Sequence, residues 1–169
     1  LSYENRTTPV TVTVTGANSG SSTNVNAFNG VESLTGGTGD DTFLVNAGGS
    51  VSGTIAGGGQ ATATGDTLSY ANRNTPVSVT LTGAGAGSGT SVNSFTGIES
   101  LVGSTANNNT LIGSNNNTTW TITGANSGSV NPGLAFSAFA NLTGGTGDDT
   151  FLVNTGGSVS GTPRPSFPS

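Results

Sequence analysis

The chain has 169 residues, a net charge of −5, 31% hydrophobic residues and only 7% charged residues, with no cysteine and no histidine. Three arginines and no lysine exclude a nucleic-acid-binding surface, which needs clustered cations to neutralise phosphates. No apolar run approaches the roughly 20 residues that cross a bilayer, and without cysteine there are no disulfides or thiolate metal sites. So few apolar residues predict a thin, elongated core rather than a deep globular one.

The first part of the chain is predicted to form short strands separated by turns. Residues Val10–Thr15 alternate apolar and polar side chains, the period of a half-buried strand, and Gly16–Gly20 interrupts it with turn-forming residues. Apolar clusters continue the pattern at Phe28, Val31, Leu34, Thr42–Val45 and Val51–Ile55. No helical period appears, so helix is not expected.

The pattern then repeats, which predicts the fold. A second unit restarts the pattern of Leu1 at Leu68, and a third repeats Gly16–Gly20 at Gly124–Gly128, so the second unit is shorter and lacks a stretch that includes the counterpart of Val51–Tyr70. A stack in which each coil contacts only its neighbours tolerates such a loss. We therefore predict an all-β, right-handed parallel β-solenoid of about eight irregular coils over residues 1–162, in three units (1–67, 68–108, 109–162). The proline-rich segment 163–169 is expected to end the stack.

One turn motif occurs twice without change. Gly36–Leu44 and Gly144–Leu152 both fit the nonapeptide Gly-Gly-x-Gly-x-Asp-x-apolar-x. This resembles the repeat of the RTX, or hemolysin-type, calcium-binding proteins and of the giant bacterial adhesins that carry it. The resemblance implies a parallel β-roll with Ca²⁺ held in the turns, and calcium prefers such hard oxygen ligands. The implied ligands are the side chains of Asp41 and Asp149 and the backbone oxygens around Gly37, Gly39, Gly145 and Gly147.

The sequence also departs from that family. RTX repeats are tandem, whereas each nonapeptide here stands alone, and a degraded copy at Gly103–Ile112 carries Asn108 and Asn109 in place of the acids. The alternative is a glycine turn whose aspartate caps its own backbone amides. Asp40 and Asp148 occupy a variable position of the motif and are weaker ligand candidates.

Catalysis is not expected. Glu32 and Glu99 occupy equivalent places in two units and are interpreted as outward-facing strand residues, while the third unit has Ala140 there. Without histidine, lysine or cysteine, most general-base and nucleophile schemes are closed.

Rows of alternating hydroxyl residues are the third signal. Stacked on one flat face, they would resemble the surface of β-solenoid ice-binding proteins, although threonine is also simply a good polar residue for the outside of a strand. Because the rows belong to separate units, we expect them to lie several coils apart. They are Thr11/Thr13/Thr15, Ser78/Thr80/Thr82 and Thr119/Thr121/Thr123.

The predicted function is structural. Leu1-Ser2-Tyr3 equals Leu68-Ser69-Tyr70, so the chain begins within a repeat and is interpreted as a processed product or a piece of something longer. We predict an extracellular adhesive or structural repeat protein of the bacterial cell surface, which forms or stiffens a fibre by head-to-tail stacking on itself or on neighbouring repeats. Surface glycans or other cells are candidate partners. The alternatives are a calcium-binding module of an RTX-type adhesin and an ice-binding solenoid.

Overall fold

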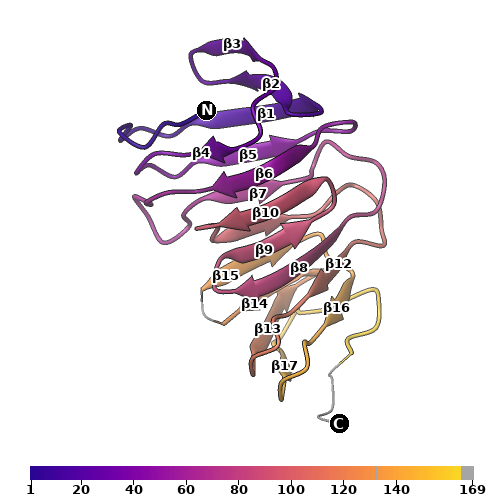
Figure 1. Cartoon of the computed structure of the whole chain (residues 1–169). Helices are drawn as coiled ribbons and strands as arrows, with labels where there is room; N and C mark the ends of the chain where they lie inside the picture. Colours follow the sequence, from indigo (N-terminus) through magenta and orange to yellow (C-terminus); the bar gives the residue numbers. More distant parts are fainter. Residues whose placement is uncertain (132, 165–169) are drawn as a thin grey trace.

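The protein is all-β, as the sequence predicts. The computed structural model describes residues 1–131 and 133–164, and within them it contains 17 strands and no helix (Figure 1). No helix in these ranges is long and apolar enough to span a membrane. The strands form two mixed sheets. The ten-stranded sheet has the order β17 (Thr150–Val153), β13 (Thr119–Gly124), β14 (Ser127–Val130), β15 (Leu134–Ser137), β11 (Ser100–Val102), β7 (Thr67–Ser69), β5 (Thr42–Val45), β1 (Thr11–Gly16), β2 (Ser19–Ser22) and β3 (Val25–Phe28). The seven-stranded sheet has the order β16 (Asn141–Thr143), β12 (Thr110–Ile112), β8 (Ser78–Gly83), β9 (Ala86–Gly89), β10 (Val92–Thr96), β6 (Val51–Ala56) and β4 (Leu34–Thr35).

The chain alternates between the two sheets. We call each visit to a sheet, whether by one strand or by three consecutive strands, a pass. It runs through β1–β3 in the larger sheet, β4 in the smaller, β5 in the larger, β6 in the smaller and β7 in the larger, and continues so to β17. Successive passes in one sheet pair in parallel, as in β1–β5–β7–β11–β15 and β8–β12–β16. Figure 1 shows the stack running from the N-terminal to the C-terminal part of the chain, with the last strand of a three-stranded segment such as β8–β10 lying nearest the N-terminal end.

Three passes depart from the parallel arrangement that the sequence predicts. In each, the chain makes an antiparallel meander of three strands: β1–β2–β3, β8–β9–β10 and β13–β14–β15. Asn18 and Asn126 adopt positive φ angles of 50° and 52° in the first turns of their meanders, a conformation that asparagine tolerates better than most residues. A purely parallel fold is therefore wrong for these segments, because the turn residues fold the chain back within one sheet.

The stretch that the second unit lacks corresponds to two passes. Between the first and second meanders the chain passes through β4, β5, β6 and β7, whereas between the second and third it passes only through β11 and β12. One pass is lost from each sheet, so the alternation is preserved. Because an even number of single strands separates successive meanders, successive meanders lie in opposite sheets. This fits the prediction that the stack tolerates the loss of a coil.

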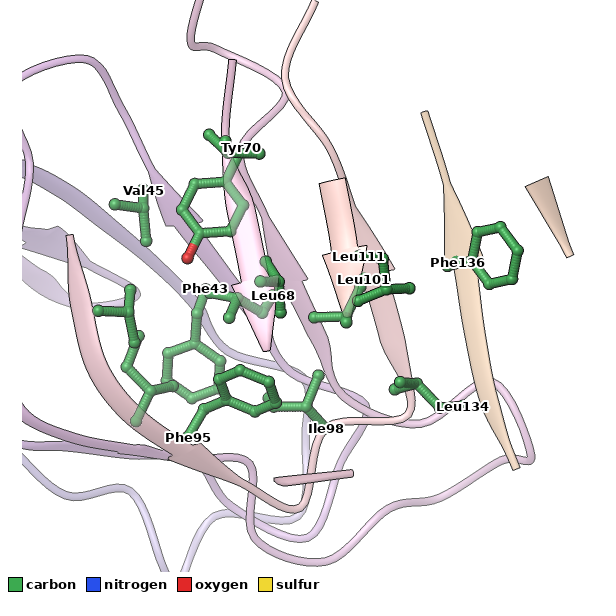
Figure 2. Packing of buried hydrophobic residues seen from close by; sticks show 14 of the residues in the cluster. Phe43, Val45, Leu68, Tyr70, Phe95, Ile98, Leu101, Leu111, Leu134 and Phe136 are labelled. Atoms are coloured by element: carbon green, nitrogen blue, oxygen red, sulfur yellow. The ribbon is translucent and has the colours of Figure 1, made fainter. Parts of the chain in front are cut away.

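The core lies between the sheets and is built from rows of paired residues. Across the larger sheet, the register joins Val12, Phe43, Leu68, Leu101 and Phe136, all at most 3% exposed. The smaller sheet contributes rows such as Leu34–Ile55–Phe95 and Val79–Leu111–Leu142. Figure 2 shows part of this thin cluster. At its C-terminal end the Trp120 ring stacks on Phe151, with centroids 5.4 Å apart.

The terminal segment continues the pattern further than expected. Thr143 forms a parallel bridge with Arg164, and the Arg164 N–H donates to Leu142 O at 2.9 Å. In the alignment that places the third unit on the first, Arg164 takes the place of Ala56, which pairs with Thr35. The rest of the predicted proline-rich segment, residues 165–169, lies outside the described residues.

Candidate functional site

Asp41 closes the first glycine turn as a buried cap. Its Oδ1 accepts the backbone N–H of Val10 at 2.7 Å, and its Oδ2 accepts the N–H of Gly37, in its own turn, at 2.5 Å. The side chain is 1% exposed. The carboxylate therefore ties the turn to the start of β1, as the capping alternative predicts.

The degraded copy uses an amide for the same task. Asn109 Oδ1 accepts the N–H of Val77, just before β8, at 2.9 Å. Its Nδ2 donates to Ser104 O, Ala106 O and Ala138 O at 2.8–2.9 Å. The side chain is fully buried without carrying a charge. The amide oxygen thus accepts the N–H before β8 as Asp41 accepts the N–H before β1, but the amide nitrogen donates to carbonyls where Asp41 Oδ2 accepts the Gly37 N–H.

Asp149 makes the third cap. Its Oδ1 accepts the N–H of Thr118 at 3.0 Å and the Thr118 hydroxyl, and its Oδ2 accepts the N–H of Gly145 at 3.0 Å. Unlike Asp41, Asp149 is partly exposed. The two identical turns therefore differ in environment.

The predicted ligand glycines allow neighbouring loops to approach. A Cβ on Gly37 would lie 2.1 Å from Arg6 O, and one on Gly145 would lie 1.8 Å from Ser114 O. Gly39 and Gly147 are similarly close to the backbone of Pro9 and of Asn116–Asn117. The Gly37 carbonyl also accepts the N–H of Gly59 at 2.9 Å. Side chains at these positions would push successive passes apart.

Calcium fits these turns only in part. Asp41 and Asp149 supply oxygens, but both carboxylates already accept backbone amides, and calcium needs six to eight ligands. Within residues 1–131 and 133–164, no group of three or more acidic side chains is placed to hold a metal. Calcium binding at Asp41 and Asp149 stays a prediction.

A ladder of three carboxylates extends the first cap along the stack. Val10 N–H donates to Asp41, Asp41 N–H donates to Asp66 Oδ1 at 2.6 Å, and Asp66 N–H donates to Glu99 Oε2 at 2.8 Å. The interpretation of Glu32 and Glu99 as strand residues is wrong, because both precede their strands; Glu32 is exposed, whereas Glu99 is partly buried. Asp66 is not among the predicted site residues, although the Gly65-Asp66-Thr67-Leu68 sequence repeats part of the turn motif.

Asp66 is electrostatically unfavourable in its charged form. The side chain is fully buried, and its Oδ2 has no hydrogen-bond partner. Burial, followed by the charges of Asp41, Glu99 and Asp40, raises its pKa to about 6, against the lowering effect of the Asp41 amide. By contrast, hydrogen bonds from the Thr62 hydroxyl and amide lower the pKa of the exposed Asp40 carboxyl. The Asp66 carboxylate is therefore suited to taking up a proton, whereas the Asp40 carboxylate anchors the loop around Thr62.

Arg73 and Tyr70 form a second buried polar pair. Arg73 is 8% exposed, and its Cζ lies 5.9 Å from the centre of the Tyr70 ring. One Arg73 nitrogen donates to Ser91 Oγ at 3.2 Å, but Nε, Nη1 and the Tyr70 hydroxyl have no partner. Burial raises the pKa of Tyr70 well above its usual value. Tyr3 in the first unit instead contacts Ser22 Oγ and Thr23 O, because Ser22 is replaced by Gly89 in the second unit.

The hydroxyl rows lie on two different faces. Thr11/Thr13/Thr15 and Thr119/Thr121/Thr123 belong to β1 and β13 of the larger sheet, and Ser78/Thr80/Thr82 belongs to β8 of the smaller one. The strands between β1 and β13 fill the gap with small residues, all of which carry a hydroxyl group except Ala135. Register pairs connect Thr11, Thr42, Thr67, Ser100, Ala135, Ser129 and Thr121 into one outer row. Sequence spacing alone misses this row, because strand pairing assembles it.

Among the described residues, β17 is the last strand at one edge of the larger sheet. β17 has the same sequence as β5, yet Leu152 and Val153 are 48% and 60% exposed, whereas Val45, the counterpart of Val153, is fully buried. The difference arises because β5 is flanked by β1 and β7, while β17 has a single neighbour, β13, within the part of the chain that the structure describes.

No protein-family model matches the chain, and neither a curated protein nor a solved structure shows significant similarity to it. Its own repeats therefore provide the comparisons, above all β5 with β17 and β7 with Leu1–Tyr3.

Proposed function

We propose that the chain is a non-catalytic structural repeat module of an extracellular bacterial fibre or adhesin, which self-associates head to tail. The alternating passes, interrupted by meanders, support a β-solenoid winding. Such a stack grows by adding passes at its ends, so an end strand with a free edge is suited to pairing with another copy.

The observation that carries this proposal is the exposure of β17. Its apolar residues Leu152 and Val153 are the large hydrophobic side chains exposed among the described residues. An exposed edge strand with apolar side chains favours association with a further strand. The broad faces carry small hydroxyl residues instead, which supports association through the ends.

Sedimentation velocity over a range of concentrations, together with negative-stain microscopy, tests this function. We expect the wild-type chain to form elongated oligomers and Val153→Asp to remain monomeric, because a carboxylate at the free edge opposes burial there. Thr15→Asp is the matched control, since Thr15 is exposed on the outer face of β1. A wild-type chain that stays monomeric at all concentrations contradicts self-association. We also propose that the assembled fibre, rather than the single chain, binds surface glycans or other cells.

The calcium-binding adhesin module remains the alternative, supported by the two intact nonapeptides. It predicts a monomeric rod whose unfolding midpoint falls in chelator. The occupied carboxylates of Asp41 and Asp149 favour the structural function over it.

Ice binding is a second alternative, and the outer row from Thr11 to Thr121 favours it. Neighbouring strands space these side chains by about 4.7–4.9 Å, so the row presents repeated hydroxyl groups that are interrupted once, at Ala135. The measurement is ice-crystal shape in dilute protein: faceted crystals that become round with Thr67→Lys support it, and unchanged growth contradicts it.

A further inference from the structure

We infer that β17 of one copy pairs in parallel with residues Leu1–Tyr3 of a second copy, in the register that joins β5 to β7 within one chain. This inference rests on the proposed self-association and specifies its partner segment and register.

The internal interface provides the template. β5 and β7 pair in parallel, with Phe43 opposite Leu68 and Leu44 opposite Ser69. The Thr67 N–H donates to Asp41 O at 2.8 Å. The pairing completes the burial of Phe43 and Leu68, which are both 0% exposed.

Both halves of this interface occur again at the ends of the chain. Thr150–Val153 repeats the sequence of β5, and Leu1–Tyr3 repeats Leu68–Tyr70. Each of these two end segments also pairs, on one side, with the same kind of neighbour as its internal counterpart. β17 pairs with β13 in the register in which β5 pairs with β1.

The N-terminal half matches its counterpart equally well. Ser2 bridges Thr35 in parallel, as Ser69 pairs with Val102, and the Tyr3 N–H donates to Thr35 O at 2.9 Å, as the Tyr70 N–H does to Val102 O. Leu1 and Tyr3 are only partly buried, whereas Leu68 and Tyr70 are fully buried. Among the described residues, β17 lacks the partner that β7 provides for β5, and Leu1–Tyr3 lacks the partner that β5 provides for β7.

The same docking extends the second sheet. In the chain, β6 lies between β4 and β10, with Phe95 opposite Ile55. At the C-terminal end, the bridge between Thr143 and Arg164 reproduces the β4–β6 contact. At the N-terminal end, β3 is an edge strand and the counterpart of β10. Docking β17 onto Leu1–Tyr3 therefore brings β3 of the second copy to the Arg164 segment, so both sheets continue across one contact.

This contact has a defined symmetry. β17 belongs to the ten-stranded sheet, whereas Ser2 extends the seven-stranded sheet through Thr35. The larger sheet of one copy is thus continuous with the smaller sheet of the next, and successive copies are related by about a half-turn around the stack. A contact between two different surfaces repeats without closing, which produces an open filament.

Engineered cysteines test the register, since the chain contains none. In the proposed contact, Leu152 lies opposite Ser2 of the next copy, as Leu44 lies opposite Ser69. Neighbouring strands are about 4.7–4.9 Å apart, within the range of roughly 4.4–6.8 Å between Cα atoms that a disulfide bridges. Both Ser2 and Leu152 are exposed, so their replacement should leave the fold intact.

We expect Leu152→Cys chains mixed with Ser2→Cys chains to give a disulfide-linked dimer, and the double variant to give a ladder of higher oligomers. Leu44→Cys with Ser69→Cys in one chain is the positive control for the register. Ser2→Cys mixed with Leu44→Cys is the matched negative control, because the edge of β5 is already covered by β7.

The outcomes separate the register from the proposed function. If the wild-type chain assembles but the Leu152–Ser2 disulfide fails to form while the control bond forms, the register is wrong and self-association stands. Preferential linkage between two Leu152→Cys chains would indicate that two β17 edges pair with each other, which also overturns the inference. If neither assembly nor cross-linking occurs, the proposed function fails as well.

Discussion

Asp66 accepts the backbone N–H of Asp41 at 2.6 Å through Oδ1, while its buried Oδ2 has no hydrogen-bond partner. A Cβ added to Gly57 would lie 2.4 Å from this Oδ2 and 1.8 Å from Gly97 O, so both oxygens border the same small space. In the equivalent turn, Asn109 Nδ2 donates to Ala138 O at 2.8 Å. Asp66 thus places a hydrogen-bond acceptor near a carbonyl oxygen, whereas Asn109 places an N–H donor near the equivalent carbonyl oxygen.

Asp66→Asn should therefore stabilise the protein at pH 7 by about 1–2 kcal/mol, because an amide can keep the bond from Asp41 and donate to Gly97 O. The pKa of Asp66 is raised from 3.8 to about 6, so the folded state binds more protons than the unfolded state between these values. The stability that this proton provides is complete below about pH 4 and is lost as the pH rises through about 6.

Urea unfolding from pH 4 to 7.5 measures this effect. We expect the difference in unfolding free energy between Asp66→Asn and wild type to grow with pH over that range. Asp40→Asn is the control: the pKa of Asp40 is lowered, so its contribution should change only below about pH 4. An Asp66→Asn variant less stable than wild type at pH 7 would show that the buried carboxylate is favourable.

The sequence predicts the strands but not all of their partners. Val10–Thr15 alternates apolar and polar side chains, which sets both the strand and its inward face. β2 (Ser-Gly-Ser-Ser) and β9 (Ala-Gly-Ser-Gly) carry almost no apolar signal, so the meanders escape periodicity arguments. These strands form because their neighbours supply backbone partners: a Cβ on Gly20 would lie 2.0 Å from Thr13 O.

The turn motif likewise predicts only part of the candidate site. Gly37 and Asp41 stand out through their repetition at Gly145 and Asp149. Glu99 does not, because its role depends on the Asp66 amide, which comes from a pass 33 residues away. Contacts between passes are determined by the register of the stack, which sequence spacing within one pass does not specify.

Trp120 is predicted to be a main stabilising residue of the C-terminal end. It is fully buried and packs against Phe136 and Phe151. Trp120→Ala should cost about 3–5 kcal/mol of unfolding free energy, because it removes a large side chain from a packed interior. Phe151→Ala should cost less, since β17 is an edge strand and Phe151 is partly exposed. Urea unfolding followed by circular dichroism compares the two, and equal costs would contradict the proposed difference.

Arg73 should be replaceable by an apolar side chain without loss of stability. Its guanidinium is buried, two of its nitrogens lack partners, and an unpaired buried charge is unfavourable. We expect Arg73→Met to leave the unfolding free energy unchanged or raise it by about 1 kcal/mol. Thermal and urea unfolding measure this change. A marked loss of stability would indicate that the stacking on Tyr70 and the bond to Ser91 outweigh the burial of the charge.

The two identical turns predict different responses to the loss of their carboxylates. Asp41→Ala leaves the N–H groups of Val10 and Gly37 without partners in a buried environment, so it should cost about 2–4 kcal/mol. Asp149→Ala should cost about 1 kcal/mol, because Asp149 is partly exposed and water can replace its contacts. Urea unfolding of both variants measures the two costs, and a larger loss for Asp149→Ala would contradict the role assigned to burial.

The role of calcium is decided by the same aspartates. If the carboxylates act as caps, the unfolding midpoint of the wild-type chain should be equal in millimolar calcium and in excess chelator, and the cost of Asp41→Ala should be the same in both. A midpoint that rises with calcium in the wild type, but not in a double Asp41→Asn and Asp149→Asn variant, would instead establish these aspartates as calcium ligands. Because the wild-type oxygens already accept amide protons, we expect the first result.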